Sequence, residues 1–205
     1  MSQQAAPWPA SPRRCTTGST TMHNTLAPNP PALSGAHLEP APRRPMLVPF
    51  GVIRIARGVG SGPTVQAARD SALLSAGLGN YHLIPLGAAM PPGSQIVRGR
   101  LQGHPLEFGQ RVYGVLSIAT ESRPGRSVYA GLGWAREPVG GQGLMVDLQD
   151  ADEDRLTRGL HTSLHHMQKD RGVSFGPVST EIAGMQCDSD PVCALVVAVF
   201  RCEPW

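Results

Sequence analysis

The chain has 205 residues and a mass of 21.7 kDa, which suits one domain of ordinary size. Hydrophobic residues make up 40% of the chain and charged residues 16%, which predicts a buried core and excludes a chain that is disordered throughout. The net charge of +3 gives no reason to expect a nucleic-acid partner, and no apolar run reaches the roughly 20 residues of a membrane helix.

Residues 1–45 differ in composition from the rest of the chain. They hold nine prolines and a single acidic residue, Glu39. Because proline lacks a backbone donor and restricts the residue before it, we expect a disordered extension here. A translation start further downstream is an alternative. The amino terminus also lacks the apolar core of a secretory signal, which predicts a cytoplasmic location.

The first predicted elements of the folded domain, residues 46–205, are a strand, a turn and a helix. An apolar, β-branched stretch at 47–56 predicts the strand. Residues 58–62, with glycine at alternate positions, predict a turn. A dinucleotide site is disfavoured there because no acidic residue stands about 20 residues on. The helix is expected to begin at Thr64 as its cap and to end at Gly77.

Strands make up most of the middle of the chain. A short strand is expected at 81–86, ended by the turn Met90–Gly93. Residues 111–120 and 127–134 predict two strands, and the Pro-Gly turn between them is typical of a hairpin. A further strand is expected at 144–149.

The carboxy-terminal part predicts one long helix and two strands. Acidic residues open the helix near 152 and Gly172 ends it; its apolar stripe is Leu156, Leu160, Leu164 and Met167. Strands are expected near 178–184 and 192–202, the second of them central because it is apolar on both faces. Strands outnumber helices, so the predicted fold class is α+β: a layered sandwich of mixed or antiparallel β-sheet covered by helices.

Metal sites and disulfides are not indicated. The four cysteines, Cys15, Cys187, Cys193 and Cys202, lack zinc spacing and are interpreted as free thiols. Three histidines, His161, His165 and His166, lie on the long helix, but without a third ligand nearby in sequence we interpret them as surface residues.

Asp147 is a carboxylate in the middle of a predicted strand, on the face opposite Leu144 and Val146. A strand carboxylate is disfavoured unless it is solvated, paired or in a pocket. Gln149 on the same face supports a plain solvent-exposed position. The residues alone leave these interpretations open.

The stretch Asp70–Asn80, followed by Leu83-Ile84 and by Met90-Pro91-Pro92, resembles the pyruvoyl-dependent arginine decarboxylases. Those proteins carry a near-identical helix, glycine turn and strand before an MPP-type turn. The resemblance continues more weakly from about residue 47 to 200. It implies the α+β sandwich of the pyruvoyl-dependent decarboxylases, a homo-oligomer that is a trimer or hexamer, and a pocket built between neighbouring subunits.

Members of the family cut their own chain at a serine just before the MPP turn, and that serine becomes an amino-terminal pyruvoyl group that binds the substrate amine. Here the aligned pair is Gly87-Ala88. Because alanine has no β-oxygen, neither the ester nor the β-elimination can form there, and no pyruvoyl cofactor is expected. A displaced serine, Ser94 or Ser61, is an alternative.

The resemblance also assigns three pocket residues. Asp70 matches the aspartate that holds the substrate guanidinium. Asp147 matches the glutamate proposed as proton donor, with a reach shorter by roughly 1–1.5 Å. His82 replaces an asparagine linked to self-cleavage.

The function that follows is binding of a guanidino or amine ligand without a pyruvoyl group. Asp147 and His82 would serve acid–base chemistry that differs from the family's decarboxylation, or they would have no catalytic role. One alternative is a non-catalytic partner of an active relative, in which Asp70 completes a neighbour's pocket. The other is an arginine decarboxylase, releasing agmatine and CO2, that works by an unforeseen processing site.

Overall fold

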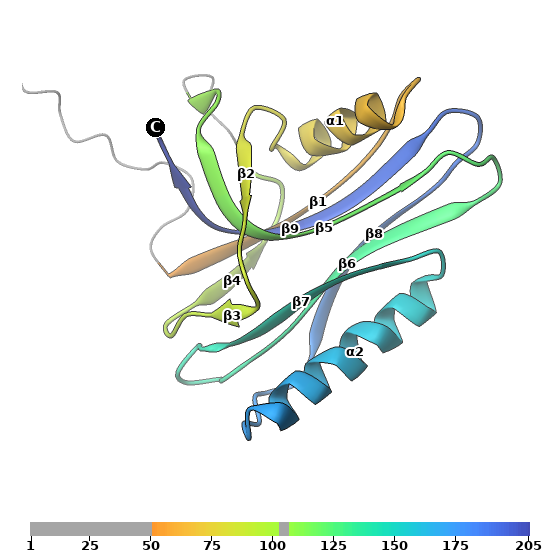
Figure 1. The fold of residues 1–205 in the computed structure, drawn as a ribbon. Coiled ribbons are helices and arrows are strands. Elements are labelled where there is room, and N and C mark those ends of the chain that lie inside the picture. Colours follow the sequence, from red (N-terminus) through yellow and green to blue (C-terminus); the bar gives the residue numbers. More distant parts are fainter. Residues whose placement is uncertain (1–50, 103–106) are drawn as a thin grey trace, which may run out of the picture. The chain divides into compact units, whose positions relative to one another are not determined.

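The structure is a computed structural model that describes residues 51–102 and 107–205. Two helices, α1 (Val65–Ala76) and α2 (Glu153–Asp170), lie on the outer faces of two β-sheets that pack against each other (Figure 1). The fold is therefore the layered α+β sandwich that was predicted, with two sheets in place of one. The predicted extension, residues 1–45, lies outside the described residues.

Sheet A has five strands and sheet B has four. Sheet A follows the order β2-β5-β9-β1-β4 and sheet B the order β3-β7-β6-β8. In sheet A, β1 pairs with β4 and β2 pairs with β5 in parallel, so this sheet is mixed. The strands are β1 (Val52–Ser61), β2 (His82–Pro85), β3 (Ala89–Met90), β4 (Gln95–Arg98), β5 (Arg111–Glu121), β6 (Ser127–Arg136), β7 (Gly143–Asp150), β8 (Ser179–Gln186) and β9 (Val192–Glu203). The central position predicted for the last strand is confirmed.

The turn predicted at 58–62 is wrong, because residues 58–61 continue β1 as a strand. Helix α1 packs directly on it. A Cβ at Gly58 would stand 2.1 Å from the backbone oxygen of Ala72, and one at Gly60 would stand 2.4 Å from the nitrogen of Ala72. Glycine within a strand often marks such a close approach of another backbone. The glycines therefore let the helix reach the sheet.

The hairpin predicted for β5 and β6 is also wrong. The two strands belong to different sheets, so the turn between them carries the chain from sheet A to sheet B. The turn itself is well made: Glu121 accepts hydrogen bonds from the backbone N–H groups of Ser122 and Arg123. The Arg123 side chain, with these backbone bonds, lowers the pKa of Glu121 to about 2. The residues of the turn predict that the chain reverses direction, but they do not determine whether β5 and β6 pair with each other.

Three apolar layers hold the sandwich together. One core fills the space between the sheets, and a second lies between α1 and sheet A. On the other side, the predicted stripe of α2 is confirmed for Leu156, Leu160 and Leu164, which are buried over Gly131 and Gly133 of β6, while Met167 is half-buried. Each layer excludes water from apolar surface, which is the main stabilising contribution.

One polar side chain joins the two sheets inside the core. Ser117 of β5 is fully buried; its hydroxyl donates to the oxygen of Leu148 on β7 at 2.6 Å and accepts from the N–H of Gly131 on β6 at 3.2 Å. Gly131 and Leu148 are register partners in sheet B. The hydroxyl therefore satisfies both backbone groups and ties sheet A to sheet B next to Asp147.

Replacing this serine is expected to destabilise the fold. Ser117→Ala leaves the buried N–H of Gly131 without its acceptor and should lower the free energy of unfolding by about 1–3 kcal/mol. Urea unfolding measures the difference. Ser122→Ala, at an exposed turn position, is the matched control and should change it by less than about 0.5 kcal/mol. Equal free energies of unfolding for the two variants would contradict the role assigned to the Ser117 hydroxyl.

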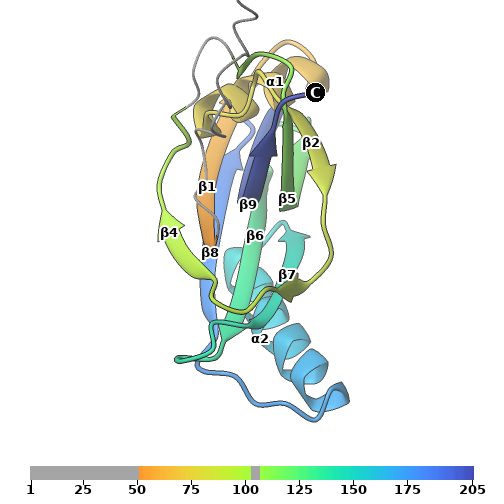
Figure 2. The same cartoon turned by 90° about the vertical axis from the view of Figure 1, so that its left-hand side faces the viewer.

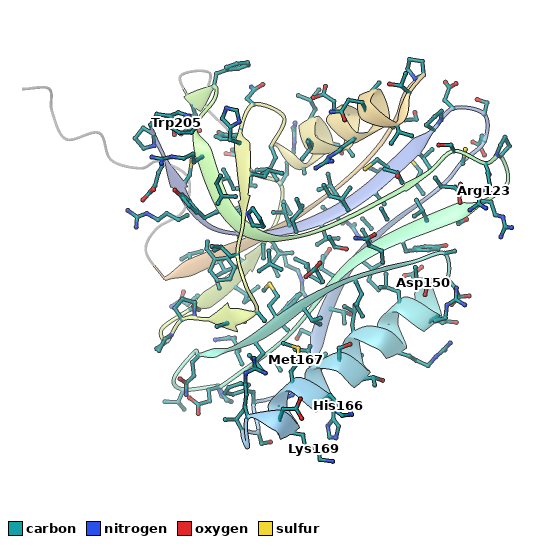
Figure 3. The ribbon with its side chains drawn as sticks, in the orientation of Figure 1. Arg123, Asp150, His166, Met167, Lys169 and Trp205 are labelled. Carbon is teal, nitrogen blue, oxygen red and sulfur yellow. The ribbon has the colours of Figure 1, made fainter. Side chains whose placement is uncertain are left out.

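The remaining sequence predictions concern membranes, metals and thiols. Among residues 51–102 and 107–205 there is no helix with the length and apolar character to cross a membrane, and no cluster of ligating side chains that could hold a metal ion. His161, His165 and His166 are exposed on α2, and His166 projects away from sheet B (Figure 3). Cys187, Cys193 and Cys202 are buried free thiols, while Cys15 lies outside the described residues.

Candidate functional site

The segment between β2 and β3 carries the chain across one edge of the sandwich, from sheet A to sheet B (Figure 2). At its start, the N–H of Leu86 donates to the oxygen of Gly114 in β5 at 2.9 Å. At its end, the oxygen of Ala88 accepts a hydrogen bond from the N–H of Met145 in β7 at 2.7 Å. Gly87 and Ala88 are therefore the crossover, held by one sheet on each side.

The crossover has an unstrained backbone and open space around it. Gly87 is exposed and is not among the described glycines with positive φ. A Cβ added at Gly87 would meet no atom within 4 Å. Ala88 is half-buried, and Met90, two residues on, belongs to the core between the sheets. The oxygen of Ala88 is bonded to Met145, another residue of that core, so Ala88 lies at the edge of the core.

Asp147 lies on the inner face of sheet B, close to the crossover. Its register partner on β6 is Leu132, which is fully buried in the inter-sheet core, and paired residues share a face. It is two residues from Met145, the hydrogen-bond partner of Ala88. Asp147 is nevertheless exposed and makes no hydrogen bond or ion pair with any described residue. Within one chain it is thus a solvated carboxylate beside the crossover.

Asp70 and His82 lie away from the crossover in the same chain. Asp70 is exposed on α1, so sheet A stands between it and β7. His82 is the first residue of β2, and four strand residues at roughly 3.3 Å each separate it by about 13 Å from Leu86. Its ring stands edge-on to the ring of Trp205, with 5.8 Å between centroids. The structure brings Ala88 and Asp147 together and leaves the other two apart, and the roles of all four stay predictions.

Ser94 is the only serine, threonine or cysteine between residues 77 and 110. Its side chain is buried, and its hydroxyl donates to the oxygen of Pro91 at 2.5 Å. Self-cleavage would require this hydroxyl to attack the carbonyl carbon of the preceding residue, Gly93. The hydrogen bond directs it to a carbonyl three residues back instead.

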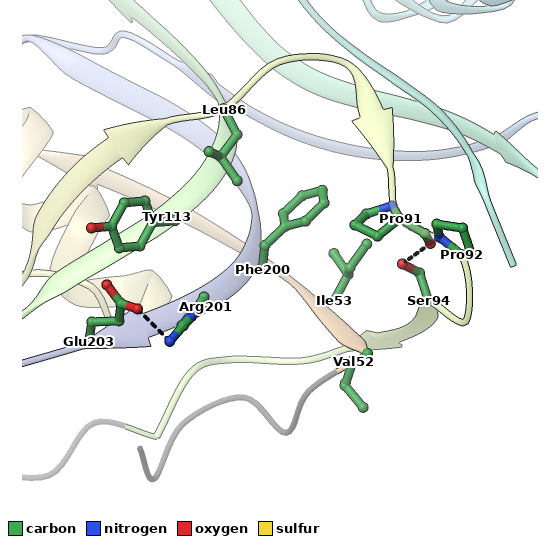
Figure 4. Close-up of a pocket in the computed structure, with 11 residues that line it drawn as sticks. Val52, Ile53, Leu86, Pro91, Pro92, Ser94, Tyr113, Phe200, Arg201 and Glu203 are labelled. Atoms are coloured by element: carbon green, nitrogen blue, oxygen red, sulfur yellow. Dashed lines mark hydrogen bonds and ion pairs between the residues drawn. The ribbon is translucent and has the colours of Figure 1, made fainter. Parts of the chain in front are cut away.

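A cavity of about 630 Å³ opens beside the crossover, at the ends of β1, β5 and β9 (Figure 4). Its wall is mostly apolar and includes Ile53, Leu86, Pro91, Pro92 and Phe200. The polar groups are Tyr113, Ser94 and the ion pair of Arg201 with Glu203, whose atoms Nη2 and Oε1 lie 2.6 Å apart. Sequence reasoning missed this cavity, because its walls come from strands far apart in the chain and no local motif marks them.

Comparison with known proteins agrees with the resemblance seen in the sequence. Residues 52–201, from the start of β1 into β9, match the family described as pyruvoyl-dependent arginine decarboxylase. Among solved structures, a pyruvoyl-dependent histidine decarboxylase is similar at 15% identity and a TM-score of 0.35, over 50% of this chain and 58% of that protein's chain. No curated protein sequence matches. The family match covers most of the chain, so this protein belongs to the pyruvoyl-dependent arginine decarboxylase family.

Proposed function

We propose that this protein is a family member that keeps its chain intact and binds a guanidino or amine ligand without a pyruvoyl group. The proposal rests mainly on the observation that the side chain at position 88 has no oxygen. By the sequence resemblance, Ala88 aligns with the family's processing position; it lies at the crossover beside β7 and carries only a methyl group.

The residues at the crossover do not fit a pyruvoyl group. Its formation needs a hydroxyl at position 88, whose oxygen would attack the preceding carbonyl and displace the amide nitrogen to give an ester. β-Elimination would then release the preceding segment as a carboxylate that keeps this oxygen, and hydrolysis of the remaining dehydroalanine would give the pyruvoyl group and ammonia. Ala88 has no oxygen to form that ester, and the hydroxyl of Ser94 is directed to Pro91. No step of the proposed function therefore passes through a pyruvoyl group. The hydrogen bond of Ser94 also weighs against a decarboxylase with a displaced processing site.

Two exposed carboxylates support ligand binding. Asp70 and Asp147 have no hydrogen-bond or ion-pair partner in the part of the chain that the structure describes. A carboxylate can hold a guanidinium by two parallel hydrogen bonds. Because the two residues lie in different layers of one chain, a ligand reaches both only if neighbouring subunits each supply one. We therefore propose a homo-oligomer in which Asp70 of one subunit binds the guanidinium and Asp147 of the next faces the amine.

Thermal shift with arginine, agmatine and other guanidino compounds tests the proposal. A ligand at 100 times its Kd should raise Tm by roughly 5–11 °C, since it stabilises the folded state by about 2.7 kcal/mol. Asp70→Ala should abolish most of this shift. Asp188→Ala, an exposed aspartate in the loop before β9, is the control and should keep it.

The same measurements separate the alternatives. A full shift in Asp70→Ala would contradict the role of Asp70, and the absence of any shift would contradict ligand binding by this chain alone. A shift that occurs only after mixing with an active family member would favour the non-catalytic partner. Light scattering gives the number of subunits, and ligand binding by a monomer would contradict the shared pocket.

A further inference from the structure

Strand β9 carries one more residue than β5 where the two strands form the cavity. Tyr113 pairs with Arg201 and Gly114 with Val199, which leaves Phe200 without a register partner. Such a β-bulge turns two consecutive side chains to one side, and both Phe200 and Arg201 line the cavity. Gly114 lies at this irregularity, where a Cβ would stand 2.4 Å from the oxygen of Ala198. The bulge is therefore what adds a charged group to an apolar wall.

The cavity has the size and composition of a small-molecule site. Its volume of about 630 Å³ lies within the roughly 300–1,000 Å³ that is usual for such sites. Apolar side chains from three separated segments converge on it. Tyr113 and the Arg201–Glu203 pair lie together at one end, whereas Ser94 lies beside Pro91 and Pro92 at the other end, where its hydroxyl is bonded to Pro91 (Figure 4). An occupant with an apolar body and one polar head would match this division.

The donors at the polar end select the head group. The hydroxyl of Tyr113 makes no hydrogen bond with any described residue. Arg201 forms its ion pair with Glu203 through Nη2, so its other guanidinium N–H groups remain available as donors. As register partners, Tyr113 and Arg201 lie side by side on the same face. A carboxylate can accept from both, and the neighbouring Glu203 carboxylate is already neutralised by its ion pair with Arg201. An ammonium would have to displace Arg201 from Glu203 while lying beside a like charge.

We propose that this cavity binds a small aliphatic monocarboxylate. Its chain would lie against Ile53, Leu86 and Phe200, and its carboxylate would accept hydrogen bonds from Arg201 and Tyr113. The site is separate from the carboxylates Asp70 and Asp147 and does not rest on the function proposed for them.

Calorimetric titration of the full chain with decanoate, decanol and decylamine tests the head group at constant chain length, with decanoate and decylamine below their micellar concentrations and decanol below its solubility limit. Decanoate is expected to bind at one site per chain, about tenfold or more tightly than decanol or decylamine, because its charged head gains hydrogen bonds that the others lack. Arg201→Gln should lower the affinity for decanoate until it is close to the affinity for decanol, and it should leave the affinity for decanol unchanged. Arg158→Gln, an exposed arginine on α2, is the matched control and should retain the preference.

A second variant tests the location. Leu86 is 39% exposed, so Leu86→Trp can add volume at the cavity wall without burying a larger side chain in the core. It should weaken the binding of decanoate and of decanol alike by about tenfold, because the larger side chain takes up space that the ligand would occupy. Unchanged binding in Leu86→Trp would overturn the location. Three results would overturn the carboxylate assignment. They are the absence of decanoate binding, equal affinity for the three head groups, and a preference for decanoate that remains in Arg201→Gln.

Discussion

A chain with serine at positions 87 and 88 and asparagine at 82 is expected to cut itself, whereas the natural chain stays whole. The triple variant His82→Asn, Gly87→Ser, Ala88→Ser returns the missing hydroxyl beside the carbonyl of residue 87. The crossover can accept it, because a Cβ at position 87 meets no atom within 4 Å and hydrogen bonds from Leu86 and to Ala88 hold the segment at both ends. Intact-mass spectrometry should find one species of 21.7 kDa for the natural chain and two fragments for the variant.

The matched control for this experiment is Gly87→Ser alone. It adds a hydroxyl one residue too early, with no oxygen at position 88, and should remain a single chain. A natural chain broken between Gly87 and Ala88 would contradict the account of Ala88. A triple variant that stays intact would show that a hydroxyl at position 88 is insufficient for self-cleavage in this crossover.

Gly58→Ala is expected to cost about 3 kcal/mol of stability or more, at the upper end of what a single added methyl group does in a packed interior. The new Cβ would lie 2.1 Å from the oxygen of Ala72 and 2.9 Å from the nitrogen of Ala76, both backbone atoms of α1 that no side-chain rotation can move. The helix would have to lift from sheet A and expose its buried alanines. Because α1 also carries Asp70, the thermal shift with arginine should fall as well.

Urea unfolding measures this loss, with Gly87→Ala as the control. The two substitutions are chemically identical, but the Cβ at Gly87 enters open space, so its effect should stay below about 0.5 kcal/mol. An unfolding midpoint for Gly58→Ala equal to that of the natural protein would contradict the packing described for α1 on β1.

The helix ends were predictable because their chemistry is local. Thr64 accepts a hydrogen bond from the N–H of Ala67 at 3.1 Å, and Gly77 ends α1 with φ at 86°. Asp152 caps α2 in the same way, accepting from the N–H of Arg155 at 2.7 Å. Each of these bonds joins residues within four positions of one another, so a short stretch of sequence contains all the information that the cap needs.

The candidate site was predictable only in part. Ala88 came from the family resemblance. Asp147 was identified first as a carboxylate in the middle of a strand, but the alternation around it did not say whether its face was buried, solvated or in a pocket. That depended on the position of sheet A over sheet B. Tyr113 and Arg201 were not identified at all, because the bulge that aims Arg201 into the cavity results from pairing between residues nearly 90 positions apart.

By itself, the sequence determined the identity of most elements, the family, and the absence of an oxygen on the side chain at position 88. These are properties of the covalent chain or of neighbours within a turn of helix. Only the tertiary structure decided that β5 and β6 belong to separate sheets, that helix α1 packs on Gly58 and Gly60, and that an apolar cavity has polar side chains at one end. Strand pairing and burial depend on which distant segments meet, and several partners satisfy the same local pattern equally well.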